Sequence, residues 1–461
     1  MYLSAVQAVY KEVFMTKSSC FRDFAKYSSL NVMGMIGLSC YILADTFFVS
    51  KGLGTNGLTA LNLAIPVYSF IHGSGLMIGM GGGTKYSIQK SQNEHKAADR
   101  TFTNAVYLAA AFAVFFVLSG IFFSGTIASL FGANESVYDM SKTYLQVILL
   151  FSPAFLMNNV LLCFVRNDGA PQLSMAAMIG GSLSNVVLDW VFIFPCHMGI
   201  FGAVFATGLA PIFSMLILSP HFIRRKNRFH FVKCRPSGKL FARIFSSGVP
   251  SLVTEVSSGV VMIVFNSIIL KLEGNVGVAA YGVIANLSLV IIAIYTGIAQ
   301  GIQPIISRSY GMNKIADINA ILRYALTAML IFSAVIYTVV FFGASQITSI
   351  FNSEQNAMLQ SIAAEGLRLY FIACPFAGFN IIISVYFTST ERPLPAHIIS
   401  VLRGFLVIIP MAFLLSRIGK IRGVWCAFPA TELLVAIIGL VLLFFVGRNR
   451  KSVKQREAAM N

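Results

Sequence analysis

The sequence predicts an all-α polytopic membrane protein, with twelve transmembrane helices in two pseudo-symmetric six-helix bundles. Three observations predict this class. Of the 461 residues, 57% are hydrophobic and only 11% are charged, whereas a soluble domain carries about 25% charged residues. The apolar residues fall into long runs, and the two halves of the chain repeat each other. Because so few charges cannot cover a soluble surface, soluble and disordered classes are excluded.

Each apolar run is long enough to cross a bilayer, since about 20 apolar residues in a helix span its hydrocarbon core. Twelve such runs occur, at residues 24–50, 56–84, 99–130, 137–165, 169–195, 198–222, 240–270, 276–307, 318–350, 357–388, 394–416 and 422–446.

The basic residues orient these spans. The chain carries 34 Lys and Arg against 17 Asp and Glu, a net charge of +17. With the N-terminus inside, 26 of the 34 fall on the inner side, including Lys11, Lys17, Arg166 and the run from Arg224 to Arg243. Loops rich in Lys and Arg stay in the cytoplasm. We therefore expect a multi-pass protein of the cell (inner) membrane with both termini cytoplasmic.

An internal repeat divides the chain. The basic linker at 223–239 separates an N-terminal bundle at 1–222 from a C-terminal bundle at 240–447, and a basic tail follows at 448–461. Shifts of 220 and 222 residues align Gly54 with Gly274, Gly81 with Gly301, Asn93 with Asn313, Pro153 with Pro375, and Pro171 with Pro393. Because each half has six spans, the halves share one orientation and an axis along the membrane normal. Two such bundles are typical of alternating-access transporters.

Several other chemistries lack their motifs. The glycines at 81–83 have no GK[ST] ending, so no ATP site is expected and an ion gradient must supply energy. The seven cysteines contain no CxxC pair and the histidines form no HExxH pattern, so neither a disulfide framework nor a zinc site is predicted. We expect no enzyme activity and no cofactor.

Acidic residues inside the spans are the candidates for function, because a carboxylate in a bilayer is costly unless it faces a cavity, a partner or a proton. They are Asp45, Asp189, Glu255, Glu365 and Glu432. Tyr41 precedes Asp45 by one helical turn, and Asn185 precedes Asp189 by one turn. The two aspartates either form one buried cluster or are separate packing residues. If they meet, both cannot ionise cheaply, so one is expected to hold a proton.

The other polar residues allow two interpretations each. Glu255 lies among small residues and is either a counter-charge for substrate or a packing residue. Gln300 and Gln303 either line the substrate cavity or join helices by hydrogen bonds. Glu365 has Arg368 one turn on, which favours an ion pair, and Glu432 has no evident partner.

This pattern resembles the multidrug and toxic compound extrusion (MATE) family over nearly the whole chain. The most specific stretches are ADTFFVSKGLG from Ala44, SNVVLDWVFIF from Ser184 and GVPSLVTE from Gly248. The resemblance implies a cation site formed by Asp45, Asn185, Asp189, Tyr41 and Thr207, with Na⁺ possible at Asp45, Asn185 and Asp189. It also matches Glu255 to a seventh-span glutamate of another branch.

Two departures from the family pattern stand out. Leu30 replaces a proline that bends the first helix in some members. The stretch from Phe376 to Asn380 lacks the tenth-span acid of the branch coupled through the C-terminal lobe. Coupling through the N-terminal bundle is therefore favoured.

The resemblance implies a secondary active antiporter that exports cationic or amphipathic drugs or toxic organic compounds in exchange for H⁺ or Na⁺ by alternating access. A lipid-linked precursor flippase of the same wider superfamily is the alternative, although such cavities usually carry several Arg or Lys. The expected partners are small organic cations and the lipid bilayer, not nucleic acid. The sequence is compatible with a monomer and does not set an oligomeric state.

Overall fold

The computed structural model describes residues 2–352 and 355–460, and it describes side chains for residues 19–352 and 355–446. The basic residues predicted near the chain ends, at Lys11, Lys17 and the tail 448–461, lie outside these described side chains. Throughout the described residues the chain is helical, joined by short connections, and it contains no strand.

Six helices form the first half of the chain. They are α1 (Tyr2–Ser91), α2 (His95–Leu130), α3 (Tyr138–Leu150), α4 (Ser152–Asn167), α5 (Pro171–Ile193) and α6 (Gly199–Ile223). The second half contains α7 (Gly238–Gly311), α8 (Ile315–Phe351), α9 (Ala357–Tyr370), the 3₁₀ turn η1 (Phe371–Ala373), α10 (Cys374–Ser389), α11 (Pro393–Val401), the π-helical turn η2 (Leu402–Leu406) and α12 (Ile408–Met460).

Twelve membrane crossings result from these helices, as the hydropathy predicts. Among the described residues, nine helical stretches are long and apolar enough to cross a membrane, if α3 and α4, bent by 46°, count as one. Three of the nine contain one residue with left-handed backbone, Gly54 in α1, Gly274 in α7 and Lys420 in α12. Each of these residues turns the chain and divides a long helix into two crossings.

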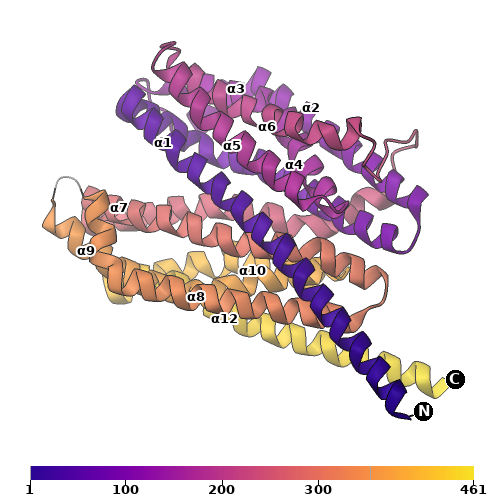
Figure 1. The fold of residues 1–461 in the computed structure, drawn as a ribbon. Coiled ribbons are helices and arrows are strands. Elements are labelled where there is room, and N and C mark those ends of the chain that lie inside the picture. The colour runs from indigo at the N-terminus through magenta and orange to yellow at the C-terminus, as the bar shows by residue number, and fades with distance from the viewer. Residues whose placement is uncertain (1, 353–354, 461) are drawn as a thin grey trace.

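The helices pack as two lobes, one built from α1–α6 and the other from α7–α12 (Figure 1). Each lobe has its own apolar core. The early part of each lobe's first helix packs in the core of the other lobe. Phe24 and Tyr27 of α1 lie in the core of the second lobe, and Ile244 of α7 lies in the core of the first. The first helix of each lobe therefore crosses to the other lobe.

The internal repeat predicted from the sequence is visible in the backbone. Gly54 and Gly274 have nearly equal φ values of 67° and 63°. Asn93 and Asn313, which end equivalent helices, have φ values of 63° and 57°. The four aligned prolines all lie in the first turn of a helix, in α4, α10, α5 and α11. Matching sequence positions thus take matching conformations in the two lobes.

Glycines bring the lobes into backbone contact at one end of the bundle. We call this the linker end, because the segment 224–237 that joins the lobes lies there (Figure 1). Gly81 of α1 lies against the backbone of Ile244, and Gly248 of α7 lies against the backbone of Met77. The symmetry-related pairs Gly301–Ser28 and Gly297–Val32 repeat this contact. The glycines at 81–83 are therefore packing residues at helix interfaces.

Replacing one of these glycines with a larger residue should push the two lobes apart at this contact. In Gly248→Val the new Cβ would overlap the Met77 backbone, and such overpacking typically costs about 1–3 kcal/mol. Gly282→Val in the same helix is the matched control, because nothing lies within 4 Å of its Cβ position. Thermal unfolding of the purified variants should show a lower melting temperature for Gly248→Val alone. Equal melting temperatures would contradict the packing account.

Candidate cation and substrate sites

The two aspartates predicted in the first and fifth spans meet inside the first lobe. Asp45 of α1 is 7% exposed and Asp189 of α5 is fully buried. Their carboxyl groups lie close enough to interact directly, and because two such groups inside a bundle cannot both ionise cheaply, the pair is expected to share one proton. In the described part of the chain neither forms an ion pair with Lys, Arg or His, and Asp45 Oδ1 and Asp189 Oδ1 have no hydrogen-bond partner. The pair therefore presents unsatisfied acceptor oxygens.

Asn185 and Thr207 complete the surroundings of Asp189. Asn185 lies one turn before Asp189 on α5, and Thr207 lies on the neighbouring helix α6; both are buried. The Asn185 amide has two possible orientations, and one of them gives both of its polar atoms a hydrogen-bond partner. In that orientation Nδ2 donates to Asp189 Oδ2 at 3.0 Å and Oδ1 accepts from the Thr207 backbone N–H at 3.1 Å. Carboxylate, amide and hydroxyl oxygens are the donors that hard cations prefer, so the set can hold a proton or accept Na⁺.

Two tyrosines lie beside the acid pair. Tyr144 of α3 is buried and lies near Thr207 and both aspartates. Tyr41 lies one turn before Asp45, but its hydroxyl pairs with the Tyr68 hydroxyl at 2.8 Å rather than with the aspartate. The direct hydrogen bond expected between Tyr41 and the acid cluster is therefore not formed in this structure.

Tyr68 begins a polar path from the acid pair to Glu255. Its ring stacks on the ring of His72 with centroids 5.8 Å apart and an interplanar angle of 17°. His72 Nδ1 lies 3.6 Å from Glu255 Oε2 on α7. The His72 and Glu255 side chains are 14% and 31% exposed. Glu255 is thus the accessible acid, and it faces a histidine of the opposite lobe.

Gln300 and Gln303 join the lobes by hydrogen bonds, which is the second of the two roles that the sequence allows for them. Gln300 Oε1 accepts from Arg166 Nη1 at 2.8 Å. Gln303 Nε2 donates to Thr84 Oγ1 at 3.0 Å, and its Oε1 accepts from Asn167 Nδ2 at 2.9 Å. Because both glutamines are buried in this interface, the cavity role assigned to them does not fit this conformation.

Arg166 was placed among cytoplasmic loop cations and is instead 1% exposed, at the end of α4. Its Nη1 also donates to Asn31 Oδ1 at 2.7 Å, and no carboxylate pairs with it among the described residues. Arg166 therefore connects three helices, α4, α1 and α7, where the lobes touch.

The remaining acids have structural partners. Glu432 accepts from Arg403 Nη2 at 2.7 Å and from Asn380 Nδ2 at 2.7 Å, in the interior of the second lobe. The ion pair expected between Glu365 and Arg368 is wrong, because Glu365 pairs with Arg422 at 2.6 Å. Glu432 and Glu365 thus each pair with an arginine, which Asp45 and Asp189 do not among the described residues.

Sequence reasoning missed Tyr68, His72 and Tyr144. A signal existed for the first two, because His72 is an ionisable residue inside a span, four residues after Tyr68 and so on the same helix face. Tyr144 had no such signal, since a single tyrosine in an apolar run is common at packed positions.

A model of the MatE family matches residues 32–191 and 250–414, one segment in each lobe. The chain belongs to the MatE family, the multidrug and toxic compound extrusion transporters. It is therefore a multi-pass protein of the cell membrane.

Relatives and solved structures support this assignment. This MATE transporter is 25% identical to the multidrug export protein MepA of Staphylococcus saprophyticus over 446 residues, which cover 96% of this chain and 98% of MepA. An outward-facing multidrug resistance MATE family transporter of the MOP superfamily has a TM-score of 0.86 at 23% identity, covering 94% of this chain and 96% of that one. A MOP superfamily transporter from Pyrococcus furiosus Vc1, whose reversed pocket polarity suggests a different function, has a TM-score of 0.85 at 23% identity, covering 93% and 95%. These likenesses confirm the two-lobe fold.

The proton that the Asp45–Asp189 pair is expected to share predicts how the stability of the protein depends on pH. The folded pair holds a proton that the unfolded chain releases above acidic pH, so the folded state binds more protons and its stability falls as pH rises, by about 1.4 kcal/mol per pH unit for one proton. Asp189→Asn removes one of the two like charges and should reduce this slope. Asp139→Asn, at an exposed carboxylate on α3, is the control.

The measurement is the free energy of unfolding of the purified protein in detergent over a pH series, with and without Na⁺. If Na⁺ occupies the pair, Na⁺ should restore stability at high pH. An Asp189→Asn variant with the wild-type pH slope would contradict a shared proton.

Proposed function

We propose that this MATE transporter is a secondary active antiporter that exports small cationic and amphipathic organic compounds in exchange for H⁺ or Na⁺. The observation that carries the proposal is the Asp45–Asp189 pair, which lies within the first lobe with unpartnered oxygens. A pair of this kind gains a proton or a small cation readily, because one added positive charge removes the repulsion between two buried carboxylates.

Exchange requires only that drug and coupling ion prefer different states of the transporter. Occupation of the acid pair changes the charge at the junction of α1, α5 and α6, and α1 also packs against the second lobe through Phe24 and Tyr27. A change at Asp45 can therefore be transmitted along one helix to the lobe interface. The coupling ion would release the drug on one side of the membrane, and drug binding would release the ion on the other.

Glu255 is the proposed counter-charge for the exported cation. It is the more exposed acid, and His72 faces it at 3.6 Å. Because His72 faces this carboxylate, its imidazole would compete with a cationic drug for Glu255. The ring of Tyr68 ties this site to Tyr41 beside the acid pair.

The contacts between the two lobes indicate on which side of the membrane the transporter is closed. Backbone contacts at Gly81, Gly248 and Gly301 and the hydrogen bonds of Arg166 all lie toward the linker end. Basic residues of the linker also lie there, which supports a cytoplasmic position for this end and for both termini. The described conformation is thus proposed to be closed to the cytoplasm, and rocking of the lobes would open it in the other half of the cycle.

The flippase alternative needs free cations that could hold phosphates in the interior. Arg403 is occupied by Glu432, and Arg166 by Asn31 and Gln300. Near the acid pair, the partly exposed side chain at which the two lobes face each other is an acid, Glu255, which favours cationic substrates there.

Asp45→Asn should abolish drug efflux while leaving membrane insertion intact, because the amide cannot take up the coupling ion. The measurement is ethidium efflux from cells or proteoliposomes, driven separately by a proton gradient and by a sodium gradient, with the amount of protein in the membrane measured in parallel. Asp139→Asn serves as the control and should transport normally. Wild-type efflux by Asp45→Asn would overturn the antiport proposal, and the gradient that drives the wild type identifies the coupling ion.

Glu255→Gln and His72→Gln should change drug affinity in opposite directions. Loss of the Glu255 charge removes an attraction of about 1 kcal/mol at a partly exposed site, so KM for a monovalent cation should rise about fivefold. His72→Gln removes the imidazole that faces the same carboxylate and should lower KM. Parallel changes in the two variants would contradict the proposed competition.

A further inference from the structure

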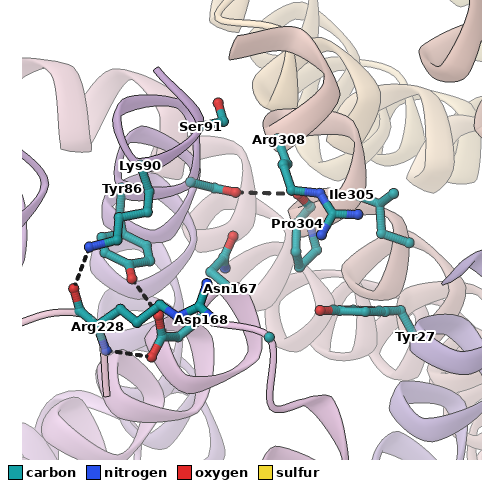
Figure 2. A pocket seen from close by; sticks show the side chains of 12 residues that line it. Tyr27, Tyr86, Lys90, Ser91, Asn167, Asp168, Arg228, Pro304, Ile305 and Arg308 are labelled. Atoms are coloured by element: carbon teal, nitrogen blue, oxygen red, sulfur yellow. Dashed lines mark hydrogen bonds between the residues drawn. The ribbon is translucent and has the colours of Figure 1, made fainter. Parts of the chain in front are cut away.

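A cavity lies at the linker end, away from the acid pair. It has a volume of about 170 Å³ and is walled by both lobes. Tyr86 and Lys90 of α1, together with Arg228 of the linker, form one side, and Tyr27 and Arg308 form the other (Figure 2). Tyr27 and Arg308 belong to the part of the structure that packs with the second lobe. The cavity exists because the lobes are closed here.

The charged groups lining this cavity are mostly cations. Lys90, Arg228 and Arg308 line it, and Asp168 is the one acid among the lining residues. Lys90 Nζ donates one hydrogen bond to the Arg228 carbonyl oxygen at 2.7 Å, and Arg308 Nη2 donates one to Asp23 at 2.9 Å. The Arg228 guanidinium has no hydrogen bond or ion pair within the described chain, although its backbone is held on both sides. Most of the N–H donors of these three groups are therefore available.

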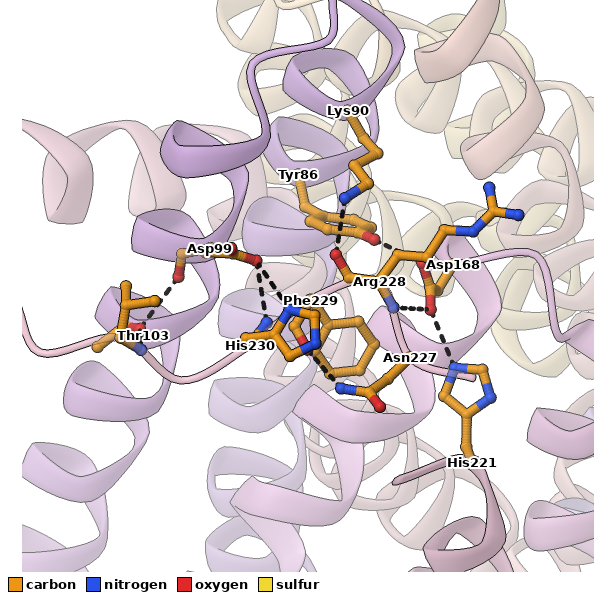
Figure 3. Close-up of polar contacts among 11 residues, drawn as sticks. Tyr86, Lys90, Asp99, Thr103, Asp168, His221, Asn227, Arg228, Phe229 and His230 are labelled. Atoms are coloured by element: carbon orange, nitrogen blue, oxygen red, sulfur yellow. Dashed lines mark hydrogen bonds and ion pairs between the residues drawn. The ribbon is translucent and has the colours of Figure 1, made fainter. Parts of the chain in front are cut away.

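Asp168 does not neutralise these donors. It is 1% exposed at the side chain, and both of its oxygens are occupied (Figure 3). Tyr86 donates to Oδ1 at 2.6 Å, while the Arg228 backbone N–H at 2.8 Å and His221 Nε2 at 3.0 Å contact Oδ2. This carboxylate therefore anchors the linker and fixes the position of Arg228 at the mouth of the cavity.

The linker is further fixed by the first lobe, so Arg228 is not on a free tether. The Phe229 side chain is fully buried among aromatic rings of the first lobe, with its centroid 4.6 Å from that of Phe102. The backbone N–H groups of His230 and Val232 donate to Asp99 and Thr103 of α2. The backbone that carries Arg228 is therefore already ordered, so ligand binding costs the linker little further backbone freedom.

We propose that this cavity binds a phosphate-bearing anion between the two lobes. Two guanidinium groups and one ammonium supply the charge and the N–H donors that a phosphate group binds, and arginine binds such groups through paired N–H donors. Basic pockets between transmembrane helices on the cytoplasmic side also receive the headgroups of anionic lipids. The phosphate can thus come from an anionic lipid or from a soluble phosphate, and the experiment separates the two.

The sign of the charge distinguishes this cavity from the drug path. A route for organic cations would be disfavoured by the three cations that line this cavity, whereas Glu255 and the acid pair are acidic. An anion here would contact Arg228 of the linker and Arg308 of α7 together. Since such a ligand binds the assembled lobes and not the unfolded chain, it would raise the stability of the protein by mass action.

The test is thermal unfolding of the full-length protein in detergent with two probes. The soluble probe is potassium phosphate, compared with potassium chloride at equal ionic strength. The lipid probe is phosphatidylglycerol, compared with phosphatidylcholine of the same chain length. Arg228→Gln removes the unengaged guanidinium, and Arg235→Gln is the matched control, because it makes the same charge change at an exposed linker position outside the cavity.

We expect the effective probe to raise the melting temperature by about 1–3 °C at about ten times its Kd. The midpoint concentration should rise about tenfold or more in Arg228→Gln, because a charged hydrogen-bond partner is lost, and should stay unchanged in Arg235→Gln. A response to phosphate identifies a soluble ligand, and a response to phosphatidylglycerol alone identifies a lipid. No response to either probe, or equal midpoints in the two variants, would overturn the proposal. The assay uses neither drug nor gradient, so its result is independent of the antiport proposal.

Discussion

Two carboxyl groups that meet inside a helical bundle impose the constraint on which the rest of this transporter depends. Asp45 and Asp189 come from different helices, so α1 and α5 must stay close enough for their side chains to meet. Their unpartnered oxygens leave the first lobe short of positive charge. A proton or Na⁺ can supply that charge, and its arrival or departure changes the electrostatic energy of a region that water cannot screen. The site therefore couples ion binding to the packing of α1.

Close backbone contact between the lobes lets a change at the acid pair move one lobe relative to the other. Because α1 and α7 each begin in the core of the opposite lobe, a displacement of either helix disturbs both cores. Glycine at positions such as Gly81 and Gly248 lets the helices touch at the linker end, and Arg166 adds hydrogen bonds that must be broken to open it. The interface is therefore suited to two discrete arrangements rather than to gradual deformation. The cationic cavity beside it lies where an anion would bridge the same two lobes.

The sequence predicted the structure best at residues whose placement has a clear energetic cost, such as acids inside a membrane span. Twelve spans, the repeat and the meeting of Asp45 with Asp189 follow from apolar length, glycine and proline spacing, and the cost of intramembrane acids together with the family resemblance. Side-chain pairing was less predictable, because it depends on helix rotation and on contacts between distant segments. Glu365 pairs with Arg422 rather than with Arg368, and Gln300 binds Arg166 across the lobe interface. His72 shows the same limit, since only the fold brings it to Glu255.

Competition between drug and coupling ion for the purified protein tests this account most directly. The measurement is the Kd of a fluorescent organic cation, titrated at a series of pH values and Na⁺ concentrations in the wild type and in Asp45→Asn. The account predicts that the drug binds the wild type more weakly as the coupling ion increases, and that Asp45→Asn loses this dependence. If the variant keeps the wild-type dependence, or if neither ion changes the Kd of the wild type, the acid pair is not the coupling site.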